Sequence, residues 1–204
     1  MAVVTKPVVS EKRDNWLTNL IPRHRCSAVL AMILALAASS ALAQTRPASE
    51  YQIKAAFLYE FGRFVEWPAS ISYSESQFPI CVLGVDPFGV LLDEALKSKS
   101  VGELTVVPRR ILGVNDATKC RVLFISSSED RRLQEILSAL GGDGILTVGE
   151  GIRFSRLGGM ISFTIEENHV RFAINASAAE EAGLRVSSQL LRLATIVETE
   201  RGEP

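Results

Sequence analysis

The chain has 204 residues, of which 47% are hydrophobic and 22% are charged. This composition supplies one well-buried domain, is too small for two, and argues against a disordered chain. Without residues 1–43, which hold five basic and two acidic side chains, the formal charge changes from −1 to −4. This mild negative charge excludes an electrostatic attraction to nucleic acid.

The first 43 residues have the three parts of a secretory signal. The basic residues Arg23 and Arg25 precede an uncharged apolar run at 26–38, and an Ala-x-Ala sequence ends at Ala43. This run is shorter than the roughly 18 apolar residues that a membrane span needs. We therefore expect cleavage after Ala43 and export from the cytoplasm. A buried helix of the fold and an uncleaved membrane anchor are the alternatives.

The mature chain is expected to begin with a flexible start at 44–50, followed by a helix at 51–67. Apolar side chains recur at helical spacing along this segment, and proline at position 68 would end the helix. The residues expected to share the buried face are Ile53, Phe57, Phe61 and Phe64.

The middle of the chain alternates between predicted strands and helices. Residues 78–85 form a continuous apolar run, which is typical of a strand buried on both sides. Asp86 and Pro87 have the residue types of a helix start, so a helix is expected from there to Lys97. Further strands are expected at 104–109, 121–126 and 145–148, with a helix at 129–140 capped by Ser127 or Ser128.

The C-terminal part is predicted to form a hairpin and helices. Residues 160–165 and 170–174 alternate in polarity around a polar turn, which indicates a β-hairpin. A short helix at 176–182 and an amphipathic helix at 187–197 should follow, and the tail at 198–204 should be frayed. The pattern predicts a single α/β domain at 51–197. Its mixed β-sheet should be flanked by helices on both faces and end with the hairpin and helix.

Two cysteines, Cys81 and Cys120, remain after the signal is removed. An even number in an oxidising compartment favours a structural disulfide. A reactive or metal-binding thiol pair and two buried free thiols are the alternatives, but the wide spacing matches no metal motif.

The mature chain lacks the residues of a recognisable catalytic site. Its single histidine, His169, cannot build a triad or a multi-histidine metal site alone. Gly158-Gly159 is more typical of a tight turn than of a phosphate or oxyanion loop. The spacing of the carboxylates does not pair them. The serines at 126–128 could bind a ligand at the end of a strand, but a helix cap explains at least one of them without a function. We therefore predict a protein that is not an enzyme and has no metal or cofactor.

Two side chains are candidates for contacts with a partner protein. Trp67 could anchor a partner if it is exposed, although a tryptophan that closes the helix against the sheet is the simpler interpretation. Arg185 could bind an acidic group, although it could equally be an ordinary surface arginine.

Several motifs follow one another in a recognisable order. They are AAFLYEFGRFVEWP at 55–68, FPICVLGVDPF at 78–88, CRVLFI at 120–125, GGMISF at 158–163 and the ending AGLRVSSQLL at 182–191. Together, over about 51–197, they resemble the YfiR-like (YfiR/HmsC-related) periplasmic family.

The resemblance implies a periplasmic regulator that represses an inner-membrane diguanylate cyclase by binding its periplasmic sensory domain, with effects on cyclic di-GMP and biofilm formation. It also implies a homodimer, sequestration by an outer-membrane lipoprotein, and a disulfide between Cys81 and Cys120. Ser155 and Ser162 stand where the best-known member has a second cysteine pair. A periplasmic small-molecule-binding sensor that serves a histidine kinase or transport receptor is the alternative function.

Overall fold

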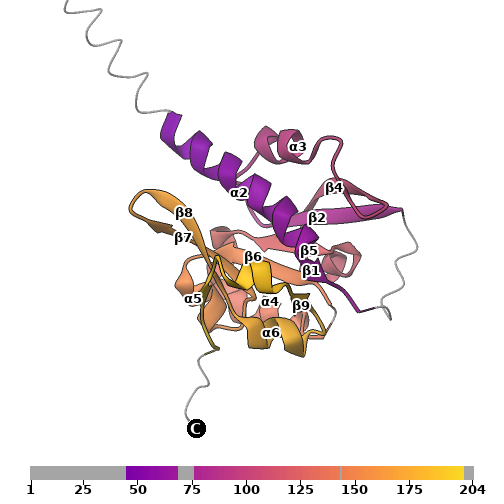
Figure 1. Cartoon of the computed structure of the whole chain (residues 1–204). Helices are drawn as coiled ribbons and strands as arrows, with labels where there is room; N and C mark the ends of the chain where they lie inside the picture. The colour runs from indigo at the N-terminus through magenta and orange to yellow at the C-terminus, as the bar shows by residue number, and fades with distance from the viewer. Residues whose placement is uncertain (1–44, 69–75, 143, 200–204) are drawn as a thin grey trace, which may run out of the picture. The chain divides into compact units, whose positions relative to one another are not determined.

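The structure, a computed structural model, describes residues 45–68, 76–142 and 144–199. Its main feature is an eight-stranded sheet with the order β10-β8-β7-β6-β5-β2-β4-β3 (Figure 1). A separate two-stranded sheet pairs β1 (Val65–Glu66) with β9 (Arg185–Val186). The main strands are β2 (Gln77–Leu83), β3 (Ser100–Val101), β4 (Leu104–Ile111), β5 (Val122–Ile125), β6 (Leu146–Glu150), β7 (Ile161–Glu166), β8 (His169–Ile174) and β10 (Thr195–Ile196).

The centre of the sheet is parallel and its flanks are mixed. Strands β4, β2, β5, β6 and β7 run parallel, whereas β3 and β8 are antiparallel to their neighbours β4 and β7. The central strands β2, β5 and β6 are buried on both faces, as the apolar run of β2 predicts. The predicted fold class, a mixed sheet with helices on both faces in one α/β domain, is confirmed.

Helices cover both faces of the sheet and divide the interior into two apolar clusters. One cluster combines one set of strand side chains with α2 (Thr45–Arg63), α3 (Val90–Leu96), α6 (Ala176–Glu181) and α7 (Ser188–Leu191). The other uses alternate strand side chains with the 3-10 helix η2 (Val114–Lys119), α4 (Leu133–Ala139) and α5 (Ile152–Arg156). Strand alternation explains the division, since Ile80 belongs to the first cluster and Cys81 to the second.

Helix α2 differs from its predicted bounds at both ends. It begins at Thr45, so residues 45–50 are helical instead of a flexible start, and it ends at Arg63 instead of Trp67. Proline 68 does not end it: the chain leaves the helix earlier to form β1, and the Phe64 carbonyl accepts a hydrogen bond from Ser187 at 2.9 Å. Ile53 was wrongly placed on the buried face, because it is exposed while Leu58 and Phe61 are fully buried.

Two other predicted helices are shorter or differently built. The chain at 86–89 forms a turn in which Asp86 accepts a hydrogen bond from the Phe88 amide at 2.7 Å, so α3 begins only at Val90. The helix expected at 129–140 starts as the 3-10 helix η3 (Ser127–Arg132) before α4. Its N-cap is Ser126, whose side chain accepts a hydrogen bond from the Ser128 amide, so neither Ser127 nor Ser128 is the cap.

The C-terminal hairpin is confirmed, but the last predicted helix is wrong. Strands β7 and β8 pair from Ile161–Ile174 to Glu166–His169, and Glu167 and Asn168 adopt the positive φ angles of a tight turn. Residues 187–197 form only the one-turn helix α7 and then β10, because the sheet edge offers backbone partners. The Val197 amide donates to the Ile174 carbonyl at 3.0 Å.

Both ends of the chain bear on predictions made from sequence. The predicted signal peptide at 1–43 lies outside the described residues. Within the described ranges, none of the helices has the length and apolarity required to cross a bilayer. In the predicted frayed tail, Thr199 is held by a 2.8 Å hydrogen bond from the Asn175 amide, and residues 200–204 are not described.

Candidate functional site

The carboxyl end of the parallel strands carries a charged cluster centred on Arg110. Arg110 lies near the end of β4, and Leu83 of the neighbouring β2 pairs with Ile111, so both strands end at the same edge. Its guanidinium donates hydrogen bonds at 2.7–2.8 Å to Asp86, Asp93 and the Gly89 carbonyl. These bonds hold the pKa of the Asp93 carboxyl below its usual value. One arginine thus ties the loop between β2 and α3 to β4.

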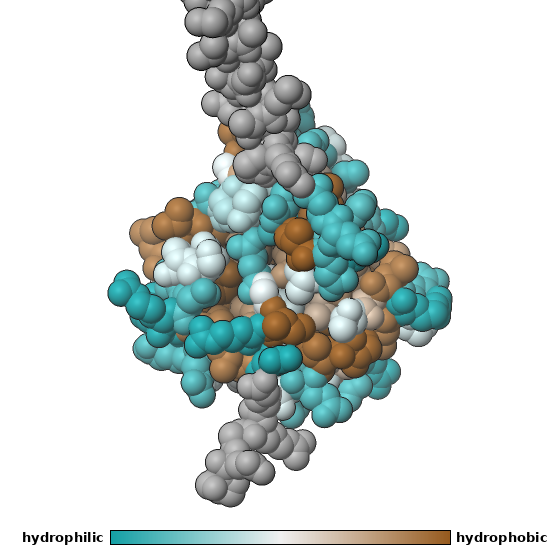
Figure 2. Space-filling model, turned by 90° about the vertical axis from the view of Figure 1, so that its left-hand side faces the viewer, coloured by the Kyte–Doolittle hydropathy of each residue, from teal (hydrophilic) through white to brown (hydrophobic). Residues whose placement is uncertain are grey.

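Large apolar side chains are exposed around this cluster. Val85 follows β2, Val90 begins α3 and Leu112 follows β4, and they are 71%, 69% and 98% exposed. We call these three residues together with Arg110 the carboxyl-edge surface. Ligands of open α/β sheets bind at the carboxyl ends of strands, and grouped exposed apolar side chains mark interaction sites. Elsewhere, the face in Figure 2 mixes apolar and polar residues instead of presenting one continuous apolar area.

The structure brings the predicted partner-binding residues Trp67 and Arg185 to one place. Strand β1 pairs Glu66 with Arg185, and Trp67 is the next residue along the chain. The Trp67 ring is half-buried, makes an edge contact with Phe78 at 5.3 Å, and lies 5.8 Å from the Arg121 guanidinium. Arg185 is exposed. Trp67 therefore packs against β2 after the helix has ended, and a partner-binding role for the pair stays a prediction.

A buried lysine joins α2 to the end of β6. The Lys54 side chain is 4% exposed and forms ion pairs with Glu50 and Glu150. Its ammonium lies 4.6 Å from the centroid of the Tyr51 ring, and the Tyr51 hydroxyl donates to Glu150 at 3.2 Å. Sequence reasoning missed this cluster, since Lys54 and Glu150 are far apart in the chain and nothing in their spacing connects them.

The position of Tyr51 predicts late ionisation of its phenol. Burial and the nearby Glu150 carboxylate raise its pKa from the ordinary 10.0 to about 12. The folded state therefore favours the neutral phenol. The resulting stabilisation is complete below pH 10 and is lost as the pH rises through 12. In an absorbance titration of the phenols, Tyr51→Phe should remove a group that ionises near pH 12. An unchanged high-pH limb in that variant would contradict the assignment.

The two cysteines form the predicted disulfide. Cys81 in β2 and Cys120 just before β5 are bonded, and both are fully buried in the second apolar cluster.

Two buried serines also lie together. The Ser155 hydroxyl of α5 donates a hydrogen bond to the Ser162 hydroxyl of β7 at 2.8 Å. A buried hydrogen bond therefore joins the positions where the best-known family member is expected to have its second cysteine pair.

The double glycine accommodates an aromatic ring. A Cβ atom at Gly159 would lie 2.1 Å from Phe154, and one at Gly149 would lie 2.2 Å from the opposite edge of the same ring. The 3% exposed Phe154 thus packs directly against backbone on two sides. Gly159 is therefore required by the packing of this ring, and Gly158 by its positive φ angle, so both have a structural role.

The other candidate groups lie on the surface of the hairpin or outside the described residues. His169 is exposed, and its Nδ1 lies 2.8 Å from the Glu167 carbonyl, which is a local contact within the hairpin. Glu166 and Glu167 are exposed beside it, and Asp143 lies outside the described residues. Across the described parts of the chain, no group of three or more His, Cys, Asp or Glu side chains is arranged to hold a metal ion.

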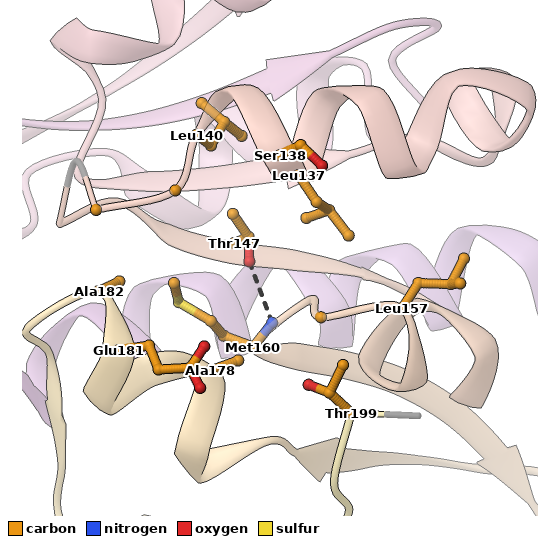
Figure 3. Close-up of a pocket in the computed structure, with 13 residues that line it drawn as sticks. Leu137, Ser138, Leu140, Thr147, Leu157, Met160, Ala178, Glu181, Ala182 and Thr199 are labelled. Atoms are coloured by element: carbon orange, nitrogen blue, oxygen red, sulfur yellow. Dashed lines mark hydrogen bonds between the residues drawn. The ribbon is translucent and has the colours of Figure 1, made fainter. Parts of the chain in front are cut away.

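A small pocket of about 230 Å³ lies at the opposite, amino edge of the sheet (Figure 3). It is bounded by α4, the turn between α5 and β7, α6 and Thr199. Thr147 of β6 lines it, and its side chain accepts a hydrogen bond from the Met160 amide at 3.1 Å. Because it is smaller than the 300–1,000 Å³ of typical ligand sites, only a small molecule would fit.

The fold and its surface define a single-domain α/β protein with exposed apolar side chains at one sheet edge. The family model described as YfiR/HmsC-like matches residues 51–195, and the chain belongs to this family.

Two solved structures are similar to the chain. One is an ABC domain from Streptococcus pneumonia in complex with L-Trp. It has 12% identity and a TM-score of 0.48 over 70% of this chain and 60% of that chain. The other is a conserved domain protein from Vibrio cholerae. It has 15% identity and a TM-score of 0.45 over 58% of this chain and 54% of that one.

Proposed function

We propose that this chain is a periplasmic regulator that binds another protein. It represses an inner-membrane signalling protein, such as a diguanylate cyclase, by binding the periplasmic sensory domain. The observation that carries the proposal is the YfiR/HmsC-like match over residues 51–195, which covers nearly all of the folded domain. Repression by binding requires a contact surface and no bond chemistry, and the carboxyl-edge surface supports this requirement.

The carboxyl-edge surface has the properties of a contact site. Full burial of one valine or leucine side chain contributes roughly 1.5–3 kcal/mol, so Val85, Val90 and Leu112 together could contribute several kcal/mol to a complex. Arg110 holds the loop that carries Val85 in one conformation, which reduces the entropy lost on binding. Trp67 and Arg185 form a second candidate contact at the β1–β9 sheet.

Redox control of this regulator would have to act through the single disulfide. Ser155 and Ser162 cannot form a second disulfide, and their hydrogen bond does not depend on the redox potential. The Cys81–Cys120 bond is fully buried and therefore protected from thiol reagents in the folded state. The proposal therefore assigns regulation to binding equilibria: homodimer formation, and capture by an outer-membrane lipoprotein.

Leu112→Glu should weaken repression without unfolding the protein. The side chain is almost fully exposed, so a carboxylate there costs little stability but cannot be desolvated in an interface. In a deletion strain complemented with this variant, we expect cyclic di-GMP and biofilm to stay raised. Crosslinking in the cell envelope should lose the partner that the wild-type protein captures.

The matched control is Leu193→Glu, a leucine that follows α7 and is 73% exposed, against 98% for Leu112. This control should repress like the wild type. A separate variant, Arg185→Glu, tests whether the β1–β9 sheet contacts the partner. If deletion of the gene leaves cyclic di-GMP unchanged and no inner-membrane signalling protein is crosslinked, the proposed function is wrong. If deletion raises cyclic di-GMP but Leu112→Glu represses normally, the carboxyl-edge surface is not the interface.

A further inference from the structure

The amino-edge pocket differs from the carboxyl-edge surface because it is a hollow whose lining combines apolar side chains with polar groups. Leu137, Leu140, Leu157 and Met160 provide alkyl and thioether surface on the walls, and Ala178 and Ala182 leave room in front of α6. An apolar lining with a few polar groups is the usual character of a small-molecule site.

The polar groups of the pocket favour a cation. Glu181 lines the pocket from α6 and also lines an adjoining hollow with Glu198, Ser177 and Thr199. Among the described residues, neither Glu181 nor Glu198 has a cationic side chain within ion-pair distance. Two uncompensated carboxylates along one hollow produce a negative potential that attracts a positive ligand.

One buried hydroxyl is available to a ligand. Thr147 is 2% exposed, and its oxygen accepts from the Met160 amide, so its own proton is left to donate. Figure 3 shows this side chain between α4 and the turn that carries Met160. The pocket thus offers a donor in its interior and carboxylate acceptors at its open side.

The walls of the pocket are held together before any ligand binds. The Asn175 amide nitrogen donates to the Ser155 carbonyl of α5 at 2.9 Å and to the Thr199 hydroxyl at 2.8 Å. The Asn175 side-chain oxygen caps α6 by accepting from the Ala178 amide at 3.0 Å. One fully buried residue therefore connects α6 and Thr199, which line the pocket, to α5, whose following turn lines it. This connection lowers the entropic cost of binding.

We propose that this pocket binds a small amphipathic amine, with its apolar body against Leu140 and Met160 and its ammonium group beside Glu181 and Glu198. The proposal adds a ligand site that is separate from the protein-binding surface. The two sites lie at opposite edges of the sheet, so an amine could bind while a partner protein occupies the carboxyl edge.

The test uses 2-phenylethylamine as the probe. Its binding to the purified exported protein is measured by isothermal titration calorimetry and by NMR chemical-shift changes. Phenylacetate and 2-phenylethanol have the same aromatic body with a negative and a neutral end. We expect saturable binding of the amine, with shifts at Thr147 and Met160, and at least fivefold weaker binding of the other two. Equal binding of phenylacetate, or no saturation by the amine at about 10 mM, would overturn the proposal.

Variants locate the site. Glu181→Gln should weaken amine binding about fivefold, as expected for roughly 1 kcal/mol from a solvent-exposed charge pair. Glu180→Gln, its exposed neighbour that does not line the pocket, should leave the affinity unchanged. Ser138→Trp should block the pocket from the exposed surface of α4 without altering the core. Normal amine binding by both Glu181→Gln and Ser138→Trp would show that the amine binds elsewhere.

Discussion

Replacing both Cys81 and Cys120 with alanine is expected to lower the melting temperature by about 10 °C. The disulfide links residues separated by 39 positions, and closing a loop of this size stabilises the fold by about 4 kcal/mol in the chain-entropy model. For a domain of this length, each kcal/mol corresponds to roughly 2–4 °C. Differential scanning calorimetry of the exported protein measures the effect.

The cysteine experiment needs a control for the volume that alanine leaves empty. Both thiols are fully buried, so part of the loss in the double variant comes from cavities. The control is wild-type protein that is reduced while unfolded and then refolded under conditions that prevent reoxidation. Its melting temperature, compared with that of the oxidised protein, gives the effect of the covalent bond alone. A double variant that melts within about 2 °C of the oxidised wild type would contradict the assigned contribution of the disulfide.

Gly159→Ala is expected to destabilise the domain by about 3 kcal/mol, the upper end of the usual cost of overpacking. The new methyl group would lie 2.1 Å from the Phe154 ring, whose other edge is already against Gly149. The ring cannot move away without displacing backbone. Urea unfolding followed by circular dichroism measures the change in the free energy of unfolding.

Two further variants show whether the ring is the cause. Phe154→Leu in the Gly159→Ala background removes the ring atoms that collide and should recover part of the lost stability. Gly141→Ala is the matched control, because its Cβ would meet only the Ser138 carbonyl at an ordinary 3.5 Å. If Gly159→Ala and Gly141→Ala unfold at the same urea concentration, the packing explanation of the double glycine fails.

The sequence pattern predicted correctly the strand that is fully buried and the hairpin that is defined by its own turn residues. The apolar run of β2 and the alternation of β7 and β8 around Glu167-Asn168 were read correctly, because period and turn chemistry are written in adjacent residues. The cap at Asn175 likewise begins the short helix that was expected there.

The candidate sites were less accessible to sequence reasoning. Trp67 and Arg185 were selected individually, and only the pairing of β1 with β9 shows that they are neighbours. Arg110 was missed, although two arginines in succession at the end of a predicted strand were a visible signal. The exposure of Leu112 had no signal, since an apolar residue after a strand is ordinarily assumed to be buried.

The sequence by itself determined the class of this protein: an α/β domain of the YfiR/HmsC-like family, with two cysteines available for a disulfide and no catalytic constellation that could be read from its residues. Tertiary structure alone decided where α2 stops, why residues 195–196 form a strand, and which charges meet. Around Phe64 and after Leu191, the apolar side chains are spaced as in a helix. The backbone there instead forms hydrogen bonds with a neighbouring strand, and this pairing overrides the local helical preference. The ion pair of Lys54 with Glu150 depends on the same long-range folding, because residues 96 positions apart meet only when α2 packs across the sheet.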